Sequence, residues 1–425
     1  MSIWARLRGG CWGRRLDGGN QGFGASRGGP LNVLQVTTQS STALKFAAPF
    51  AAWLRARGHR VTLACSGRSF ADAPRQIEAL RALGFEVVEL DIPRAVEPLA
   101  DAAAVWAAWR LMRSGRFDVV HTHNSKAGVI GRCAAALAGV PTVFHTNHGL
   151  AVEVAERYGT LEGQLHVQVE RWMSRLSNLI FVVSEAERAK ALRYRVAPME
   201  KLVLVGQGID AAYFSRAAVS AAEVEAARGA LGLGPGPLVG TVSRLVAEKG
   251  LETLVEAVAL MARERPDVGA VVVGEGPERG RLEALAREHG VAGRVRFVGH
   301  RSTAEVRALL AAMDVFVFPT RWESFGVVLL EAMAMEVPVV ASAIAPVDGI
   351  VVAGQTGLLV GVDRPAAFAR ATLGLLADGE VRAAMGQRGR LRVLGHYAEE
   401  AMFRKMEAAY VAAAQARASE SFKRA

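Results

Sequence analysis

The stretch Asp314-Val-Phe-Val-Phe-Pro-Thr-Arg-Trp-Glu-Ser-Phe-Gly-Val-Val-Leu-Leu-Glu331 predicts a buried strand, a turn and an apolar helix. The residues from Phe325 onwards are apolar on nearly every face, which is typical of a buried helix. Glu323 precedes this helix, and Glu331 lies inside it as a predicted buried carboxylate that needs hydrogen-bond donors. Sugar or ribose hydroxyls are suitable donors, and the free amides at the helix start favour a phosphate. The alternative is a first-turn acid followed by a satisfied core acid.

A second strand-to-helix turn, Gly240-Thr-Val-Ser-Arg-Leu-Val-Ala-Glu-Lys-Gly250, lies upstream and carries two cations. Arg244 offers a planar fork to phosphate oxygens and Lys249 a mobile point charge. Together they are suited to neutralise the diphosphate of a nucleotide leaving group. The alternative is a solvated loop with a surface lysine.

The next predicted strand ends in Val271-Val-Val-Gly-Glu-Gly-Pro277. Gly274 and Gly276 are the residues that would let a nucleotide approach the backbone closely. This motif is weak by itself. With the cationic turn before it and the two glutamates after it, each at the end of a strand, it indicates a nucleotide-sugar site.

With these motifs in this order, the chain resembles the family 4 retaining glycosyltransferases over roughly residues 31–415. Three further segments are similar to the branch that builds capsule, O-antigen, lipopolysaccharide and other surface polysaccharides. They are His121-Thr-His-Asn-Ser-Lys-Ala-Gly128, Val143-Phe-His-Thr-Asn-His-Gly-Leu150 and Val203-Leu-Val-Gly-Gln-Gly-Ile-Asp210.

The resemblance implies the α/β GT-B fold, with two Rossmann-like, doubly wound parallel-sheet domains facing a cleft. It also implies metal-independent transfer, without a cofactor, from a UDP- or GDP-sugar to a glycan or lipid-linked saccharide, with retention at the anomeric carbon. The residues expected at the site are His148, Arg244, Lys249 and Glu323 for catalysis, and Gly274, Gly276, Val298, Gly299, Ser324, Phe325, Gly326, Val327 and Glu331 for the donor. Where relatives carry a glycine pair, Ser40, Ser41 and Thr42 predict an open, hydroxyl-bearing loop on the acceptor side.

Short β-branched runs alternate with helical patterns in two series, which is the signature of doubly wound parallel sheets. We predict a first domain over 31–230 and a donor domain over 238–395, joined by the glycine- and proline-rich linker 232–237. A C-terminal helix over 396–425 is expected to cross back to the first domain. The glycine- and arginine-rich residues 1–30 predict a disordered arm, or a start codon placed too far upstream.

Composition fits a globular protein of two domains, with 425 residues, 51% hydrophobic and 22% charged. Three widely spaced cysteines indicate a reducing compartment, and we expect a cytoplasmic protein. The net charge of +10 favours peripheral contact with an anionic membrane over nucleic acid, for which no motif is present. Residues 101–116 carry tryptophans and arginines at helical spacing and are a candidate contact. Alternatively, Trp106 and Trp109 pack against the sheet.

Several functional alternatives remain open. A soluble small molecule or sugar could replace the lipid-linked acceptor, the chemistry could be phosphorolysis or epimerisation, or the chain could be a catalytically silent basic membrane adaptor. His121 and His123 lie on the same side of a strand, yet a metal pair would need a third ligand that is not near in sequence. A packed, polar role at the strand end is therefore favoured for them.

Overall fold

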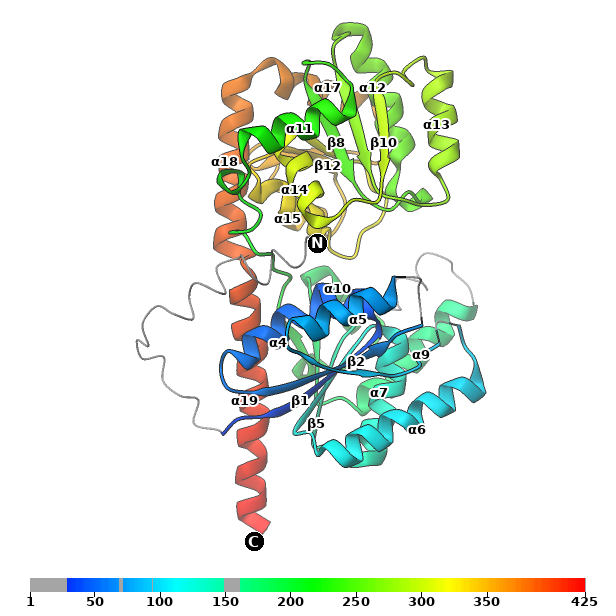
Figure 1. The fold of residues 1–425 in the computed structure, drawn as a ribbon, viewed down its shortest axis with the longest axis vertical. Helices are drawn as coiled ribbons and strands as arrows, with labels where there is room; N and C mark the ends of the chain where they lie inside the picture. Colours follow the sequence, from blue (N-terminus) through cyan, green and yellow to red (C-terminus); the bar gives the residue numbers. More distant parts are fainter. Residues whose placement is uncertain (1–28, 69–71, 94, 149–160, 425) are drawn as a thin grey trace. The chain divides into compact units, whose positions relative to one another are not determined.

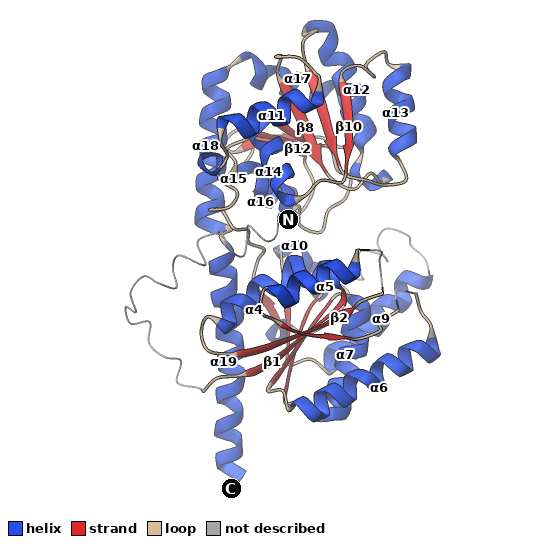
Figure 2. Ribbon diagram, viewed as in Figure 1, coloured by secondary structure: helices blue, strands red, loops and turns tan. Residues whose placement is uncertain are grey.

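The computed structural model describes residues 29–68, 72–93, 95–148 and 161–424, and shows two compact units, each a parallel sheet flanked by helices (Figures 1 and 2). Gln207–Ala401 forms the C-terminal unit. The described residues up to Gly206, together with those from Met402 onward, form the N-terminal unit. The predicted arm at 1–30 lies, except for its last two residues, outside the described chain.

The N-terminal unit contains seven parallel strands in the order β3-β2-β1-β4-β5-β6-β7. The strands are β1 (Asn32–Gln39), β2 (Arg60–Ser66), β3 (Glu86–Glu89), β4 (Val119–His123), β5 (Thr142–Thr146), β6 (Leu179–Val182) and β7 (Leu202–Leu204). The helices are α3 (Ser40–Thr42), the π-helix η1 (Ala43–Ala47), α4 (Ala48–Arg55), α5 (Ala73–Ala82), α6 (Pro98–Gly115), α7 (Ser125–Ala138), α9 (Leu161–Arg175), α10 (Glu185–Arg193) and the 3₁₀ turn η2 (Met199–Lys201).

The C-terminal unit contains six parallel strands in the order β10-β9-β8-β11-β12-β13. The strands are β8 (Leu238–Val242), β9 (Gly269–Val273), β10 (Val295–Gly299), β11 (Val315–Phe318), β12 (Val339–Ser342) and β13 (Gly357–Val360). The helices are η3 (Arg216–Ala218), α11 (Ala221–Leu231), η4 (Ala247–Lys249), α12 (Leu251–Glu264), α13 (Arg279–Glu288), α14 (Thr303–Ala312), α15 (Val327–Ala334), α16 (Val347–Ile350), α17 (Pro365–Ala377) and α18 (Gly379–His396), and α19 (Glu399–Arg424) begins here.

Strand alternation determines which helices cover which face of the N-terminal sheet. On β5, Val143 packs with α6 and α7, whereas the next residue, Phe144, packs against Tyr410 of α19 with ring centroids 4.8 Å apart. Because successive side chains of a strand point to opposite faces, α19 covers the face opposite to α7. Helix α4 lies beside α19, since Phe50 contacts both Phe403 and Tyr410. The end of the chain is therefore part of the N-terminal unit.

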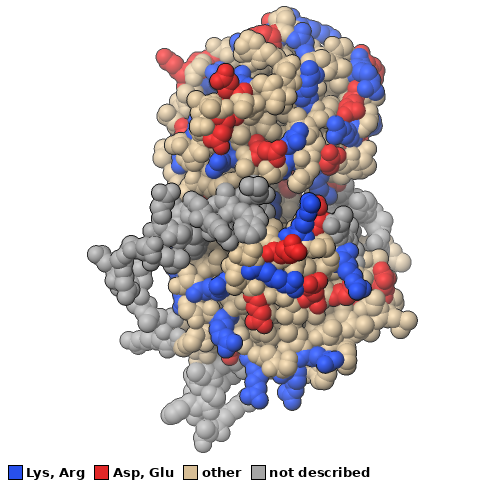
Figure 3. All heavy atoms as spheres, viewed as in Figure 1, with Lys and Arg blue, Asp and Glu red and all other residues tan. Residues whose placement is uncertain are grey.

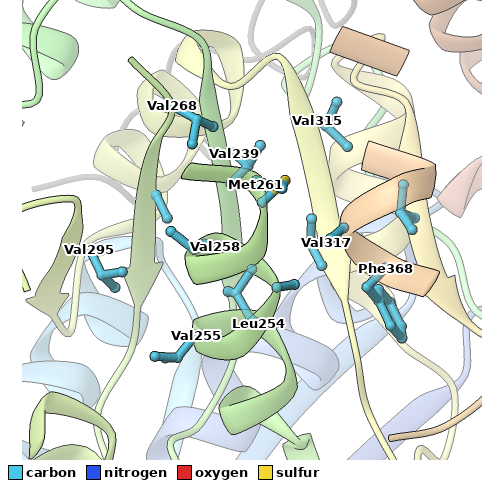
Figure 4. Close-up of a cluster of buried hydrophobic side chains, with 14 of the residues drawn as sticks. Val239, Leu254, Val255, Val258, Met261, Val268, Val295, Val315, Val317 and Phe368 are labelled. Atoms are coloured by element: carbon cyan, nitrogen blue, oxygen red, sulfur yellow. The ribbon is translucent and has the colours of Figure 1, made fainter. Parts of the chain in front are cut away.

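The core of the C-terminal unit lies between α12 and the central strands (Figure 4). Leu254, Val255 and Val258 are spaced as one face of a helix and are fully buried against β8, β9 and β11. Val317 of β11 and Phe368 of α17 extend this cluster. The packing fixes the strands whose carboxyl ends carry the candidate donor residues.

The structure departs from the predicted elements at three places. The change of unit falls between Gly206 and Gln207, so 232–237 lies inside the C-terminal unit, between α11 and β8. Arg228 of α11 holds this helix within the C-terminal unit, because it donates hydrogen bonds to the carbonyls of Ala312 and Gly236 and to the carboxylate of Asp314. The short strand β13 was not predicted. Ser40–Thr42 was expected to be a loop but forms the helical turn α3, which continues through η1 into α4.

Charged side chains of both signs are mixed on the visible face of each unit (Figure 3). Some of the ion pairs are local in sequence, such as Arg281 with Glu278 and Arg188 with Glu185, whereas others join distant segments, such as Arg132 with Glu170. Among the described residues, no helix is both long enough and apolar enough to span a bilayer.

Candidate active site

The predicted donor residues follow the carboxyl ends of four neighbouring strands. In sheet order, β10 ends at Gly299, β9 is followed by Gly274, β8 by Arg244 and β11 by Glu323. The strand order reverses between β8 and β11, since β9 continues on one side of β8 and β11 lies on the other. Ligands of doubly wound sheets bind outside the carboxyl ends of the strands at such a switch point.

An ion pair joins the two sides of this switch point. Lys249 Nζ lies 2.7 Å from Glu323 Oε2, and the two side chains are only 8% and 14% exposed. Lys249 ends the 3₁₀ turn after β8, whereas Glu323 lies in the loop after β11. The sequence predicted Lys249 on the donor diphosphate and Glu323 on the donor sugar, and the structure brings both into one contact. Charges this well buried interact strongly and are positioned by each other.

Arg244 occupies a different environment from Lys249. Its side chain is 69% exposed, and its guanidinium is 2.9 Å from Glu248, which is 10% exposed. Glu248 was not predicted at the site. Its main-chain carbonyl accepts hydrogen bonds from the Arg321 amide and the Thr320 hydroxyl, so it also joins the loops after β8 and β11. An exposed guanidinium with one carboxylate partner remains open to phosphate oxygens.

Backbone hydrogen bonds hold the loops after β8, β9 and β10 together. The amide of Leu245 donates to Glu275, the amide of Glu278 donates to Leu245, and Gly274 donates to Gly299. Gly274, with a φ of 133°, lies against the Ser243 carbonyl, and a Cβ there would overlap that oxygen. Gly276 is similarly close to the Leu245 carbonyl. The sequence attributed these glycines to nucleotide approach. The structure shows that packing of one loop on the next already requires them.

Helix α15 begins immediately after the Glu323 loop, as predicted. Gly326 is its N-cap with a φ of 94°, a left-handed conformation that suits glycine, and the Ser324 amide donates to Glu323 Oε1. The Leu329 amide donates to the Gly326 carbonyl, whereas the amides of Val327 and Val328 precede the first hydrogen bond of the helix and favour an anion or a sugar hydroxyl. Glu331 differs from the prediction because it is half-buried rather than fully buried, on an otherwise apolar helix.

The pocket-shape residues predicted around β10 lie at the end of that strand. Gly299 has a φ of 73° and lies close to the Glu275 carboxylate, while Val298 is half-buried. Glu275 also pairs with Arg279, 3.3 Å away, so a charged pair borders this end of the sheet.

His148 belongs to the N-terminal unit, where it follows β5. Its backbone has a φ of 53°, which is unusual for a residue other than glycine. Burial lowers the pKa of His148 from 6.5 to about 4, so the ring is neutral at pH 7. Its Nε2 is 3.0 Å from His123 Nδ1, and its ring lies 4.6 Å from that of Phe46 in the π-helix η1. Gly149, the other half of the predicted His-Gly loop, lies outside the described residues.

The open loop predicted on the acceptor side is wrong, because Ser40–Thr42 forms the helical turn α3. Ser40 is buried and its hydroxyl donates to Gln76, so it does not face a ligand. Ser41 and Thr42 are half-buried, and the Thr42 hydroxyl accepts from Asn124 at 3.4 Å. Only Ser41 and Thr42 thus retain exposure suited to binding an acceptor.

The strand-end histidines form a buried polar layer on the α19 face of the sheet. His121 and His123 point to the same side, as predicted, with ring centroids 4.2 Å apart. Both nitrogens of His121 are engaged, with Thr146 at 2.8 Å and Tyr410 at 2.7 Å. His123 contacts His148 and Gln35 in the same way. Burial lowers the pKa values of His121 and His123 well below 6.5, and neighbouring histidines lower them further.

Sequence reasoning missed Gln35, Glu248 and Tyr410 as partners of the site residues. Gln35 lies within an apolar strand, where a polar residue facing the core was the available signal. Tyr410 had no local signal, because its contact with His121 spans 289 residues of sequence.

Two family models match the chain and together cover most of it. Residues 43–208 match the glycosyl transferase 4-like domain, and residues 224–392 match the glycosyl transferases group 1 domain. The first model covers most of the N-terminal unit and the second most of the C-terminal unit.

Curated relatives and solved structures agree with these matches. The chain is 32% identical over 269 residues to the glycogen synthase of Mycobacterium tuberculosis, covering 63% of this chain and 62% of that protein. It is 37% identical over 166 residues to the lipopolysaccharide core biosynthesis glycosyltransferase LpsE of Rhizobium meliloti, covering 39% of this chain and 47% of that one. The Anabaena HepE structure with UDP and glucose superposes with a TM-score of 0.76 at 20% identity, over 89% of this chain and 99% of that one. The chain therefore belongs to the family 4 glycosyltransferases of GT-B fold.

Proposed function

We propose that the protein transfers a glycosyl group from a UDP- or GDP-sugar to a glycan or lipid-linked saccharide in the biosynthesis of a surface polysaccharide or glycolipid. The observation that carries this proposal is the Lys249–Glu323 pair at the switch point of the C-terminal sheet, with Arg244 exposed beside it in sequence. Two cations and a carboxylate at the carboxyl ends of neighbouring strands fit a sugar diphosphate. The cations can bind the phosphates, and the carboxylate can accept hydrogen bonds from sugar hydroxyls.

The chemistry follows from where charge develops. The bond from the anomeric carbon to the diphosphate oxygen breaks, and a bond to the acceptor hydroxyl oxygen forms on the same face, so the configuration is retained. The acceptor proton passes to the departing diphosphate oxygen. Lys249, Arg244 and the first amides of α15 stabilise the negative charge on the leaving group. Because protein cations supply this stabilisation, we expect transfer to continue in the presence of EDTA.

The donor class is tested by titration calorimetry of the purified protein with UDP, GDP, ADP and their sugar conjugates. UDP is the first candidate, since HepE was solved with UDP and glucose. We expect selective binding of one nucleotide family that weakens in Arg244→Ala and Glu323→Ala. The matched control is Arg265→Ala. Arg265 is also partly exposed and paired with an acid, Asp267, but it lies before the amino end of β9, away from the carboxyl ends of the strands. Absence of binding by every nucleotide would contradict the proposal.

The acceptor class rests on the relatives, among which LpsE is named for lipopolysaccharide core biosynthesis. Transfer from radiolabelled donor to lipid-linked saccharides, to free glycans and to small sugars would distinguish the classes. We expect the lipid-linked or glycan acceptors to be labelled, and NMR of the product to show the anomeric configuration of the donor. Labelling of small sugars alone would support the soluble-acceptor alternative.

We further propose that the protein is cytoplasmic and that it rests on an anionic membrane through helices α6 and α9, which both pack against α7. Each presents an exposed stripe that is apolar at its start, continues with a tryptophan and is basic at its end. On α6 these are Leu99, Trp106, Arg110 and Arg113, and on α9 they are Leu161, Leu165, Trp172 and Arg175. Trp106 is 57% exposed, whereas Trp109 is half-buried and packs against the core, so the two tryptophans have different environments. Interfacial helices have this distribution of tryptophan and arginine.

Vesicle sedimentation tests this contact. We expect binding to vesicles containing anionic lipid, weaker binding to zwitterionic vesicles, and loss of binding in Trp106→Ala/Trp172→Ala. Leu391→Ala is the control, because Leu391 is an equally exposed apolar residue on α18 of the C-terminal unit. Equal binding by the tryptophan variant and the wild type would rule these helices out.

A further inference from the structure

Gln35, His123 and His148 form a continuous hydrogen-bonded chain in the N-terminal unit. Gln35 Oε1 is 3.1 Å from His123 Nε2, and His123 Nδ1 is 3.0 Å from His148 Nε2. Gln35 lies on β1, His123 ends β4 and His148 follows β5, so the chain crosses the switch point between β1 and β4. Gln35 is 0% exposed and His123 is 2% exposed. The bond between Gln35 and His123 is therefore shielded from water, whereas the bond between His123 and His148 is partly buried.

With Gln35 Oε1 facing His123, the protons of this chain have one consistent arrangement. Both imidazoles are neutral at pH 7 because burial lowers their pKa values, so each ring carries one N–H. An amide oxygen only accepts, hence His123 holds its proton on Nε2 and donates it to Gln35. His123 Nδ1 then accepts from His148, which holds its proton on Nε2. The remaining nitrogen of His148, Nδ1, is left with an unprotonated lone pair.

The neighbouring histidine shows that this directionality is specific to the chain. His121 is bonded to two hydroxyls, those of Thr146 and Tyr410. A hydroxyl can donate or accept, so these partners satisfy the ring without selecting a tautomer. Gln35 differs because its oxygen cannot donate. The backbone of His148 is also held in a left-handed conformation, and such strain persists only where the surroundings fix the residue.

We infer that Gln35 and His123 are positioning residues that hold His148 in the Nε2–H tautomer, with Nδ1 presented as a hydrogen-bond acceptor for a sugar hydroxyl. This inference rests on the proposed glycosyl transfer. The neutral acceptor nitrogen orients a hydroxyl without adding a positive charge that would attract the diphosphate to the wrong place. Phe46, packed on the His148 ring from the π-helix η1, limits rotation of the ring.

The test is ¹⁵N NMR of the full chain labelled at histidine, using two-bond ¹H–¹⁵N correlations at pH 7, which distinguish the two tautomers and the imidazolium. A His148→Gln spectrum assigns the signal. We expect wild-type His148 and His123 both as Nε2–H. An Nδ1–H or doubly protonated His148 would overturn the inference, and this result requires no variant that might misfold. The opposite orientation of the Gln35 amide would reverse both tautomers and would be visible in the same spectrum.

Gln35→Met keeps the volume and removes the acceptor. We expect His148 to become a mixture of tautomers, and kcat to fall about tenfold while KM for the donor changes less than twofold. Tyr410→Phe is the matched control, because it removes another buried hydrogen bond from the same layer and should leave the His148 tautomer unchanged. An unchanged tautomer in Gln35→Met would refute the positioning role. If the wild type bound no nucleotide, the transferase proposal would be contradicted instead. The His148 tautomer measured by NMR would still show whether Gln35 orients His148.

Discussion

The two units have corresponding switch points with opposite chemistry. In each sheet, the first strand of the unit has the second strand on one side and the fourth strand on the other. Side chains that follow these strands meet at their carboxyl ends. In the C-terminal unit that meeting is an ion pair, Lys249 with Glu323. In the N-terminal unit it is the neutral chain of Gln35, His123 and His148. The fold selects the location, whereas the residues there determine which ligand chemistry it suits.

The difference matches the two substrates of the proposed reaction. A sugar nucleotide brings two phosphate charges, and fixed cations stabilise the charge that grows on them during transfer. An acceptor brings hydroxyls, which are oriented by neutral donors and acceptors rather than by charge. Burial supports both choices, since it strengthens the ion pair and keeps the histidines neutral.

The largest expected effect is on the charged side of the comparison. Lys249→Gln should lower kcat by roughly 10²–10³-fold, because it removes a buried cation that stabilises the leaving diphosphate. Breaking the pair also leaves Glu323 without its partner, so the variant should lose about 3–5 kcal/mol of stability. Steady-state rates and urea unfolding of the C-terminal unit measure the two effects.

A double variant separates function from stability. Lys249→Met/Glu323→Leu replaces the pair with apolar groups of similar volume, which is often neutral or stabilising at buried sites. We expect it to recover stability and to remain inactive. Recovery of transfer in the double variant would show that the pair is structural. The ion pair would then not be a binding site for the donor diphosphate.

The second prediction concerns pH and the neutral side. His148 has a folded pKa of about 4 against 6.5 in the unfolded chain, so the unfolded chain binds more protons as the pH falls. The stability that results is present above pH 6.5 and is lost between 6.5 and 4, by up to about 3 kcal/mol for this residue. His121, His123 and His145 shift in the same direction and add to the loss.

The C-terminal unit should not share this acid sensitivity. Among its described groups with a shifted pKa, the carboxyls of Glu223 and Glu305 are lowered from 4.5 by hydrogen bonds from serines, so their contribution is lost only below that pH. Hydrogen exchange measured by mass spectrometry at pH 7, 6 and 5, corrected for intrinsic rates, reports each unit separately. We expect protection to fall first in the peptides from β4 and β5. Equal loss of protection in β8 and β9 would contradict the distinction.

The sequence predicted the charged site more completely than the neutral one, for a physical reason. Arg244, Lys249 and Glu323 lie on strand-to-helix turns, and parallel strands bring such turns to one edge, so local patterns suffice. The His148 chain depends on Gln35 inside an apolar strand and is backed by Tyr410 near the end of the chain. Contacts at such separations leave no periodic signal. The helical turn at Ser40–Thr42 was missed because a run of small hydroxyl residues is also typical of loops.

The third prediction tests whether α19 supports the histidine layer. Tyr410→Phe removes the hydroxyl that lies 2.7 Å from His121 Nδ1 and leaves a buried ring nitrogen without that partner. The cost should be about 1–3 kcal/mol, read as a lower urea midpoint for the N-terminal unit. The aromatic packing with Phe144 and Phe50 is retained, so the fold should persist. An unchanged midpoint would mean that the hydroxyl is satisfied elsewhere.

The smallest effect on stability is expected at Arg244. A substitution there should reduce nucleotide binding while leaving stability nearly unchanged, in contrast to Lys249. The guanidinium is 69% exposed and its pair with Glu248 is local in sequence, so Arg244→Ala should change the free energy of unfolding by no more than about 0.5 kcal/mol. Nucleotide affinity should nevertheless fall about tenfold, because a phosphate contact to a fork-shaped cation is lost. Arg244→Lys keeps the charge but not the fork, and an intermediate affinity would show that geometry contributes beyond charge. If Arg244→Ala instead lowered stability and left affinity unchanged, Arg244 would be a structural residue and Lys249 alone would carry the donor charge.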